Sequence, residues 1–316
     1  MPPSAQGGCY DNAQSITCPP GGASYFGQDA QYPDRVRTLT DKELSRTNLP
    51  TGYDAYHAVQ DSLTALTWQT KVVECLGTPA VCTDKPVQNV PKSWQQAADA
   101  CAASPYGGFS DWHLPNVYEL RSIAQYQSGS PASSSEFGGV LAAGRYWTST
   151  VGGLSTPDEW FVDFTDGSAG IGYRTDAYTF ICVRGSAWIP KDVSRYQDAE
   201  YAASQKVLVD LATLLFWAKD VPSASTWQQG LSYCEGLSYA SFTDWRLPGV
   251  NELGSLIRTG STPATDALGI GAQPYWTSTT DGSVLTDAWT VEFTSGLVKP
   301  AGKAGTKAVV CVRGRP

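Results

Sequence analysis

The sequence has little of what most catalytic and metal centres use. It contains one methionine, two histidines (His57 and His113) and no Cys-x-x-Cys pair of the kind that holds zinc. No apolar run reaches the roughly 18 residues that a transmembrane helix needs. Basic residues are also few, 22 against 30 acidic ones, so the net charge is −8. This charge disfavours nucleic acids and anionic membrane surfaces as partners.

The scarcity of histidine also argues against a catalytic role. His113 stands where a second copy of the same motif has Arg246. We therefore interpret His113 as a hydrogen-bonded loop residue, and we expect no enzymatic activity. A hydrolase or oxidase activity that is not visible in the sequence is the alternative.

What the chain does contain is a long internal repeat. The shared landmarks are a Trp, a Cys, Asp-Trp-x-Leu-Pro, Glu-Leu, Tyr-Trp-Thr-Ser-Thr, another Trp and Cys-Val-Arg-Gly. Trp94 precedes Cys101 by seven residues, and Trp227 precedes Cys234 by the same number. A unit of this length is a duplicated domain, because solenoid repeats have about 20–50 residues.

The duplication predicts four segments. Residues 51–186 form repeat one and residues 201–316 form repeat two, and each is long enough to bury a core. Residues 1–50 are rich in Gly, Pro, Ser and Asp. We expect them to form an extended, disulfide-pinned arm on the first domain, with partial disorder as the alternative. Residues 187–200 are expected to form a packed linker.

The eight cysteines predict disulfides and an oxidising compartment. Because two cysteines recur in each repeat, the most economical pairing lies within the repeats, and the other four form two local pairs. The predicted bridges are Cys9–Cys18, Cys75–Cys82, Cys101–Cys182 and Cys234–Cys311. Each long bridge closes about 80 residues, which contributes about 4–5 kcal/mol on the chain-entropy model.

Local patterns predict the same α+β order in each repeat: a hairpin, two helices and an antiparallel sheet. Ser93 is expected to cap a helix whose apolar face carries Trp94 and Cys101. A second, short helix is expected after Pro115, with Glu119 in a capping box. The predicted strands of repeat one are Tyr146–Thr150, Trp160–Phe164 and Phe180–Arg184.

As an ordered set, these motifs resemble the domain family named after the C-terminal domain of the Legionella collagen-like adhesin. The resemblance covers roughly residues 55–186 and 200–315 and implies a secreted or surface bacterial protein. The pattern is also similar to the C-type lectin-like superfold, whose conserved disulfide matches the predicted bridge from first helix to last strand. The resemblance therefore implies two tandem C-type lectin-like domains. The sugar-binding tripeptides and the active-site cysteines found in parts of that superfold have no counterpart, so neither activity carries over.

Carboxylates near the second recurring tryptophan are candidate metal ligands. Asp158 and Glu159 precede Trp160, and Asp163 follows it in the same strand. Calcium needs six to eight oxygen ligands from such a cluster. We therefore consider a calcium ion at Asp158, Glu159 and Asp163, with a solvated acidic rim as the favoured alternative.

The lectin-like resemblance implies that ligands meet the loops between the later strands. Those loops are Val151–Glu159, Asp166–Tyr178, Asp281–Ala288 and Ser295–Lys307, and they differ between the repeats. A constant scaffold with divergent loops is typical of a recognition module. The candidate ligand-binding residues are Asp158, Glu159, Tyr173, Tyr178, Asp281 and Asp287. Tyr173 and Tyr178 are the candidates for exposed stacking, because the recurring tryptophans are expected in the core.

Two functions fit these expectations. The first is an extracellular or surface-displayed module that binds a glycan or a surface protein. The second is a structural subunit of an extracellular fibre or sheath, built by head-to-tail contacts between copies. We expect an extracellular or cell-surface location, with the periplasm as an alternative. Residues 1–4 lack the basic and apolar parts of a signal peptide, so we interpret a leader as already removed.

Overall fold

The computed structural model describes residues 9–21, 23–25, 28, 39–45, 53–62, 64–76, 81–86, 90–126, 137, 141–152, 158–185, 195–200, 205–211, 213–219, 224–257, 268, 270–271, 273–293 and 295–314. Of residues 39–45, 53–56, 71–76 and 81–86 only the backbone is described. None of the helices in these ranges has the length and apolarity needed to span a membrane.

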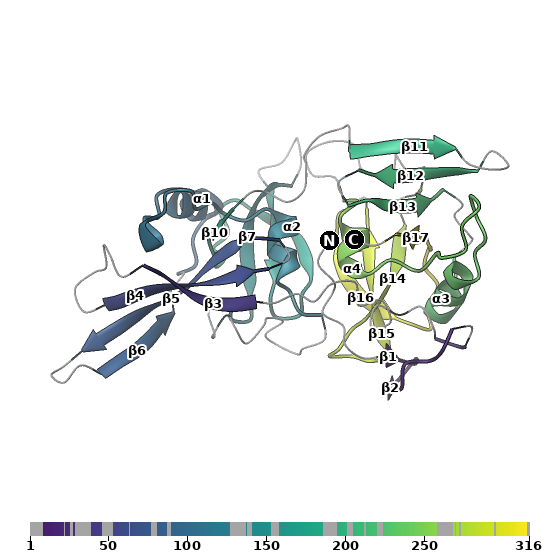
Figure 1. The fold of residues 1–316 in the computed structure, drawn as a ribbon, viewed down its shortest axis with the longest axis horizontal. Coiled ribbons are helices and arrows are strands. Elements are labelled where there is room, and N and C mark those ends of the chain that lie inside the picture. The colour runs from purple at the N-terminus through teal and green to yellow at the C-terminus, as the bar shows by residue number, and fades with distance from the viewer. Residues whose placement is uncertain are drawn as a thin grey trace.

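Both repeats are α+β and share one order of elements (Figure 1). Repeat one contains β3 (Leu39–Ser45), β4 (Tyr53–Asp61), β5 (Thr67–Leu76), β6 (Val81–Pro86), α1 (Trp94–Ala102), the 3-10 helix η2 (Tyr106–Gly108), α2 (Val117–Ser122), β7 (Arg145–Val151), β8 (Asp158–Asp163), β9 (Ala169–Tyr173) and β10 (Val183–Arg184). Repeat two contains β11 (Tyr196–Glu200), β12 (Lys206–Asp210), β13 (Leu215–Ala218), α3 (Trp227–Glu235), α4 (Val250–Gly254), β14 (Pro274–Thr280), β15 (Asp287–Glu292), β16 (Val298–Gly302) and β17 (Val312–Arg313).

The predicted hairpin is present in both repeats and is held by the same side chains. Thr64 Oγ1 donates to Asp61 Oδ2 (2.6 Å), and Leu66 N–H donates to Thr64 Oγ1 (3.3 Å). The equivalent Thr213 N–H donates to Asp210 Oδ1 (3.4 Å). Because β5 begins at Thr67, Thr64 and Leu66 lie in the turn of the hairpin.

The last, short strand of each repeat returns to this hairpin. β10 pairs antiparallel with β5, and β17 pairs antiparallel with β13. The cysteine just before each short strand is joined to the first helix, through Cys101–Cys182 and Cys234–Cys311, with Cα–Cα distances of 5.4 and 5.5 Å. The predicted clasp between the early helix and the terminal strand is therefore confirmed, as is Cys9–Cys18. In the β5–β6 hairpin the backbones of Cys75 and Cys82 are direct partners, but their side chains lie outside the described residues.

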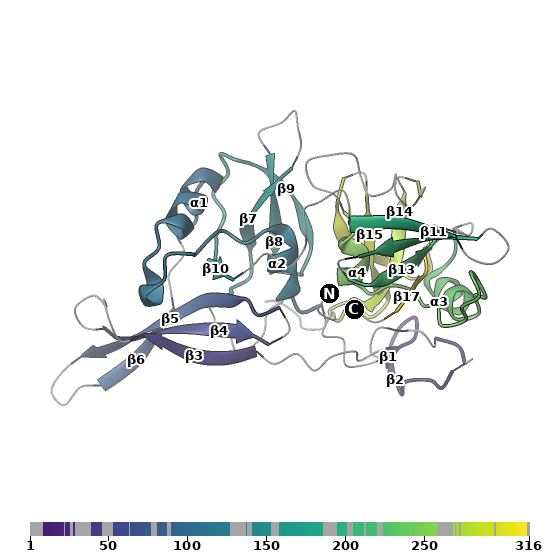
Figure 2. The same ribbon diagram turned by 45° about the horizontal axis from the view of Figure 1, so that its top comes forward.

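A six-stranded antiparallel sheet joins the two repeats. Its strand order in the described chain is β14-β15-β16-β9-β8-β7. At its centre Ala169 of β9 pairs with Val298 of β16, and these residues occupy equivalent positions in the two repeats. From either edge, the sheet therefore presents equivalent strands in the same order. The arrangement is that of an isologous dimer in which both subunits belong to one chain. Figure 2 shows β7, β8 and β9 in repeat one and β14 and β15 in repeat two, which belong to the two halves of this sheet.

Tryptophans pack reciprocally across this pseudo-twofold axis. The ring of Trp160, from repeat one, lies directly over Gly296 of repeat two, so closely that a Cβ there would overlap it. The ring of Trp289, from repeat two, lies beside Gly167 of repeat one, 3.7 Å from where a Cβ would stand. Both glycines have positive φ, +68° and +91°, in the turns that precede β16 and β9. A turn glycine in each repeat thus makes room for the other repeat's indole.

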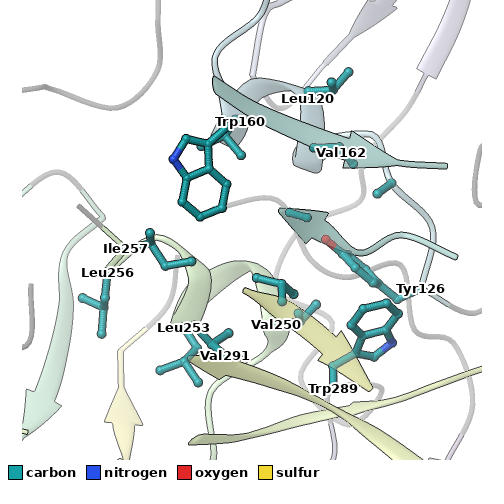
Figure 3. Close-up of a cluster of buried hydrophobic side chains, with 14 of the residues drawn as sticks. Leu120, Tyr126, Trp160, Val162, Val250, Leu253, Leu256, Ile257, Trp289 and Val291 are labelled. Carbon is teal, nitrogen blue, oxygen red and sulfur yellow. The ribbon is translucent and has the colours of Figure 1, made fainter. Parts of the chain in front are cut away.

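The two short helices complete a single shared core. Leu120 and Val162 of repeat one belong to the same buried cluster as Leu253 and Val291 of repeat two (Figure 3). Arg121, buried in this interface, donates from Nη2 to the carbonyl oxygen of Val250 (3.0 Å). A continuous apolar core of this kind makes the two repeats one packed body, in place of two domains joined only by a linker.

The structure corrects three sequence-based boundaries. Leu39–Ser45, assigned to the arm of residues 1–50, is β3 of the repeat-one sheet. The Cys9–Cys18 loop, with β1 (Cys9–Tyr10) and β2 (Ser15–Ile16), lies against repeat two beside α3 and not on repeat one (Figures 1 and 2). Tyr196–Glu200, assigned to the linker 187–200, is β11 of repeat two, while residues 186–194 lie outside the described chain.

Candidate functional site

The recurring tryptophans form a hydrogen-bonded frame. The indole N–H of Trp94 donates to the carbonyl of Thr148 (2.8 Å), and that of Trp227 donates to the carbonyl of Thr277 (2.8 Å). The other four recurring tryptophan positions are buried in both repeats, with exposures of at most 3%. Their assignment to the core is confirmed, and Trp94 alone among the recurring tryptophans is half-buried.

The aspartate of Asp-Trp-x-Leu-Pro pairs with the arginine of Cys-Val-Arg-Gly. Arg184 Nε donates to Asp111 Oδ1 (2.8 Å), and Arg313 Nε donates to Asp244 Oδ1 (2.7 Å). These hydrogen bonds are the main reason that the pKa of each aspartate lies below its usual value. The ion pair explains why both motifs recur together.

The residue after each Asp-Trp pair contacts the capping glutamate, and here the repeats differ. Arg246 forms two hydrogen bonds of 2.6 Å with the carboxylate of Glu252, and both side chains are buried. His113 Nε2 lies 3.5 Å from Glu119 Oε2, and its side chain is 39% exposed. The hydrogen bond to Glu119 raises the pKa of His113, whereas the contacts with Arg246 outweigh burial and lower the pKa of Glu252. Both glutamates also cap their helices, through Asn116 N–H and Gly249 N–H (2.8 Å each), as predicted.

One surface of repeat one combines aromatic and cationic groups. We call it the repeat-one platform and define it by Trp94, Tyr173, Arg174 and Tyr178. The Arg174 guanidinium lies over the Trp94 ring, 4.8 Å from its centroid, and its side chain is 44% exposed. Tyr173 is 64% exposed. An exposed tyrosine beside a stacked guanidinium offers a ligand both apolar area and hydrogen-bond donors.

A buried carboxylate supports the platform from below. The side chain of Glu159 is fully buried, and its Oε1 accepts from Arg174 Nε (2.5 Å). Burial raises the pKa of Glu159 although Arg174 opposes the shift. Among the described residues, Glu159 Oε2 has no hydrogen-bond partner.

Tyr178 proves to be a supporting residue. Its ring stacks on Trp147 with a centroid distance of 4.3 Å, and its hydroxyl donates to Asp176 Oδ2 (2.9 Å) and accepts from Arg145 Nη1 (3.1 Å). Burial raises the pKa of this hydroxyl. Of the two tyrosines that the sequence offered for stacking, the structure therefore leaves Tyr173 as the exposed one.

At the equivalent surface of repeat two, the cation and the tryptophan are covered by the chain itself. We call it the repeat-two platform and define it by Trp227, Gly302, Lys303 and Lys307. Lys303 is 1% exposed, and its ammonium lies 4.1 Å from the Trp227 ring centroid. It donates to the main-chain carbonyl of Asp11 in the Cys9–Cys18 loop (2.7 Å). Burial lowers the pKa of Lys303 to about 8.

Arg174 and Lys303 were not among the sequence-based site residues. A signal for them exists, because each stands eight residues before the closing cysteine of its repeat. Arg174 and Lys303 are not identical and share only their positive charge, so identical residues in the two repeats do not reveal them.

The remaining ligand-binding candidates lie in repeat two. Asp281 is 8% exposed and accepts from Ser283 N–H (2.9 Å), and burial raises its pKa. Asp287 accepts from the hydroxyl of Thr286 (3.0 Å). Both aspartates contribute to the electrostatic environment of Lys303. The structure thus places them near the covered platform of repeat two and apart from Tyr173.

The structure does not gather the calcium candidates into a site. Asp158 and Glu159 are consecutive in β8, so their side chains point to opposite faces of the sheet. Glu159 is engaged by Arg174, and Asp163, at the far end of the strand, lies 3.5 Å from Arg145 Nε. Within the described ranges, no three Asp, Glu, His or Cys side chains cluster as metal ligands would. These residues therefore lack the oxygen cage that calcium needs.

The sequence comparisons agree with the duplicated architecture. The model of the Lcl C-terminal domain matches the chain twice, at residues 57–184 and 206–313. These matches cover most of the chain, and the protein belongs to the Lcl C-terminal domain family. A search of curated proteins finds no match.

Proposed function

We propose that this protein is an extracellular or surface-displayed recognition module that binds a glycan or a surface protein through the repeat-one platform. One observation carries the proposal: equivalent surfaces of the two repeats are treated differently by the chain. The cation of the repeat-two platform, Lys303, is covered by the Cys9–Cys18 loop, while its counterpart Arg174 is exposed on the repeat-one platform, as is Tyr173. A surface that already holds a polypeptide in one repeat is a credible binding surface in the other.

The chemistry of the platform supports this role. Tyrosine supplies a large contact area at small entropic cost, since it has only two side-chain torsions. Arg174 is held by Trp94 and Glu159 and is therefore oriented before a ligand arrives. A pre-oriented guanidinium loses little freedom on binding. These features favour binding over turnover.

The extracellular location is part of the proposal. Two disulfides clamp the repeats and a third closes the N-terminal loop, which is the expected usage in an oxidising compartment. We further propose that each repeat has the C-type lectin-like superfold, supported by the helix-to-last-strand disulfide. A crystal structure of the protein, compared with known lectin-like domains, would test that assignment.

Alanine substitution at the platform tests the binding role. Tyr173→Ala and Arg174→Ala, made separately in the full chain, should each weaken retention on a glycan array or on immobilised cell-surface proteins by about tenfold or more. Val284→Ala is the matched control, because Val284 is also an exposed apolar residue (48%) but lies in repeat two. If both platform variants bind every target as the unchanged chain does, the proposal is wrong.

The fibre subunit remains the second candidate. The docked Cys9–Cys18 loop favours it, because the chain carries one such loop and two similar platforms, so a loop of one copy has a second platform on which it can dock.

A further inference from the structure

The N-terminal loop is a prebuilt unit. The Cys9–Cys18 disulfide closes it, and Asp11 Oδ1 accepts from the N–H groups of Ala13 and Gln14 (2.7 Å each). Gln28 is fully buried and binds both the N–H and the carbonyl of Tyr10 (2.7 Å each). A loop held by its own bonds loses little entropy when it docks.

The loop presents three groups to the repeat-two platform. The Asp11 carbonyl accepts from Lys303, while Tyr10 lies on the cation with its ring centroid at 5.9 Å. The Tyr25 ring packs near Trp227 at a centroid distance of 6.4 Å. The recognition unit is thus a main-chain carbonyl flanked by two tyrosines, placed on a cation that stands over a tryptophan.

The repeat-one platform offers the same arrangement. The main-chain N–H of Trp94 donates to the Arg174 carbonyl (3.0 Å), and the main-chain N–H of Trp227 donates to the Lys303 carbonyl (3.2 Å). The backbone therefore holds the tryptophan and the cation in the same relation in both platforms. Glu159 supplies a fully buried carboxylate whose Oε2 has no partner among the described residues. The Cβ of Tyr173 would not obstruct a loop docked on the repeat-one platform. A Cβ at the equivalent Gly302 would meet only Asp287 Oδ1, at 3.9 Å.

Covering repeat one should cost less desolvation than covering repeat two. Docking buries Lys303 with no carboxylate ion-paired to it in the described part of the chain, and its lowered pKa reflects that burial. Arg174 is already neutralised by Glu159, and a guanidinium is more weakly hydrated than an ammonium group. The loop's own platform is therefore the electrostatically less favourable of the two.

We propose that the Cys9–Cys18 loop of one copy of this chain docks on the repeat-one platform of a second copy, with its Asp11 carbonyl on Arg174. This inference rests on the binding role proposed for that platform. Each copy donates one loop and accepts one, so the contact is heterologous and builds an open filament, or a closed ring if the rotation between copies closes. Docking on its own repeat two competes, because a tethered loop has an effective concentration of about millimolar.

Two variants of the full chain should change self-association in opposite directions. Lys303→Met removes the donor that holds the loop on repeat two, so it should release the loop and promote association. Glu159→Ala with Arg174→Ala removes the donor of repeat one and the carboxylate that orients it, and should lower association by about tenfold. The fold should tolerate Glu159→Ala, because repeat two has Ala288 at that position. A nonspecific loss of structure would move both variants the same way.

Sedimentation velocity over a range of protein concentrations, with electron microscopy of the same samples, measures this association. A synthetic disulfide-closed peptide of residues 9–28, labelled for fluorescence anisotropy, gives a second readout on the full chains. The peptide should bind Lys303→Met and should lose about tenfold in affinity when Glu159 and Arg174 are replaced in that background.

The outcomes separate this inference from the proposed function. If the peptide binds no variant and Lys303→Met stays monomeric, while Tyr173→Ala still weakens binding to a glycan or surface protein, only self-docking is wrong. If the platform variants change neither kind of binding, both proposals are wrong. Peptide binding that depends on Lys303 alone would also overturn self-docking on repeat one.

Discussion

Repeat one and repeat two make the same frame but treat its charged positions differently. Both frames use the same indole-to-carbonyl bonds and the same helix-to-strand disulfide. Beside Asp-Trp, however, repeat two buries Arg246 against Glu252, and repeat one has the partly exposed His113 against Glu119. On the platform, repeat two has a covered Lys303, while repeat one has an exposed Arg174 on a buried Glu159.

The comparison teaches which positions the fold requires. Groups that hydrogen-bond the backbone, such as Trp94 and Trp227, recur because an indole supplies an N–H donor on a large apolar ring that packs in the core. Positions that need only a cation tolerate Arg, Lys or His. At these positions the side chains of the two repeats differ in the pH range over which they titrate and in their solvent exposure. The platform belongs to the second group.

The largest expected effect concerns what the repeats share. Replacing Cys101 and Cys182 together by serine should lower the free energy of unfolding by about 4 kcal/mol, and replacing Cys234 and Cys311 should have a similar effect. The two bridges close similar lengths of chain, 81 and 77 residues apart. Urea denaturation without reductant measures both. A negligible cost at either bridge would contradict the equivalence of the clasps.

The next effect should distinguish the repeats. Arg246→Met leaves Glu252 buried without its cation and should cost about 3–5 kcal/mol. His113→Met removes a weaker, partly exposed contact and should cost less than about 1 kcal/mol. Denaturation of both variants at pH 7 makes the comparison, and equal costs would refute it.

The shared interface predicts a smaller contrast between two turn glycines. Gly296→Ala places a Cβ in the Trp160 ring at positive φ and should cost about 2–4 kcal/mol. At Gly167 the Cβ would lie 3.3 Å from Tyr126, so Gly167→Ala should cost about 1–2 kcal/mol, mainly from its φ of +91°. Thermal unfolding of the two variants provides the measurement. A larger cost at Gly167 would mean that Trp160 is not packed as described.

The smallest effect is a pH dependence specific to repeat one. Because the hydrogen bond to Glu119 raises the pKa of His113 above the usual 6.5 of a histidine, the charged pair stabilises the fold below pH 6.5. That contribution is lost as pH rises through the folded pKa. Solvent exposure limits it to a few tenths of a kcal/mol up to about 1 kcal/mol. His113→Arg should abolish this part of the pH profile, since arginine stays charged. An unchanged profile between pH 5.5 and 8.5 would exclude His113 as its source.

The sequence predicted the local elements well where side chains signal them locally. Helix α1, the capping by Glu119 and the strands around Trp147 and Trp160 all follow from periodicity and caps. It missed β9 and β16, which we had assigned to divergent loops. Ala169–Tyr173 reads Ala-Gly-Ile-Gly-Tyr, and glycine gives little strand preference by itself.

By itself, the sequence determined the duplication, the bridges within each repeat and the buried tryptophan frame. These depend on residue types at fixed spacings, which a single chain displays. Only the tertiary structure decided that β9 pairs with β16 and that the N-terminal loop covers Lys303. It also decided that Trp160 and Trp289 each pack against a turn glycine of the other repeat, across a pseudo-twofold axis. Such contacts join residues more than a hundred positions apart, and complementary shape selects them without leaving a local pattern.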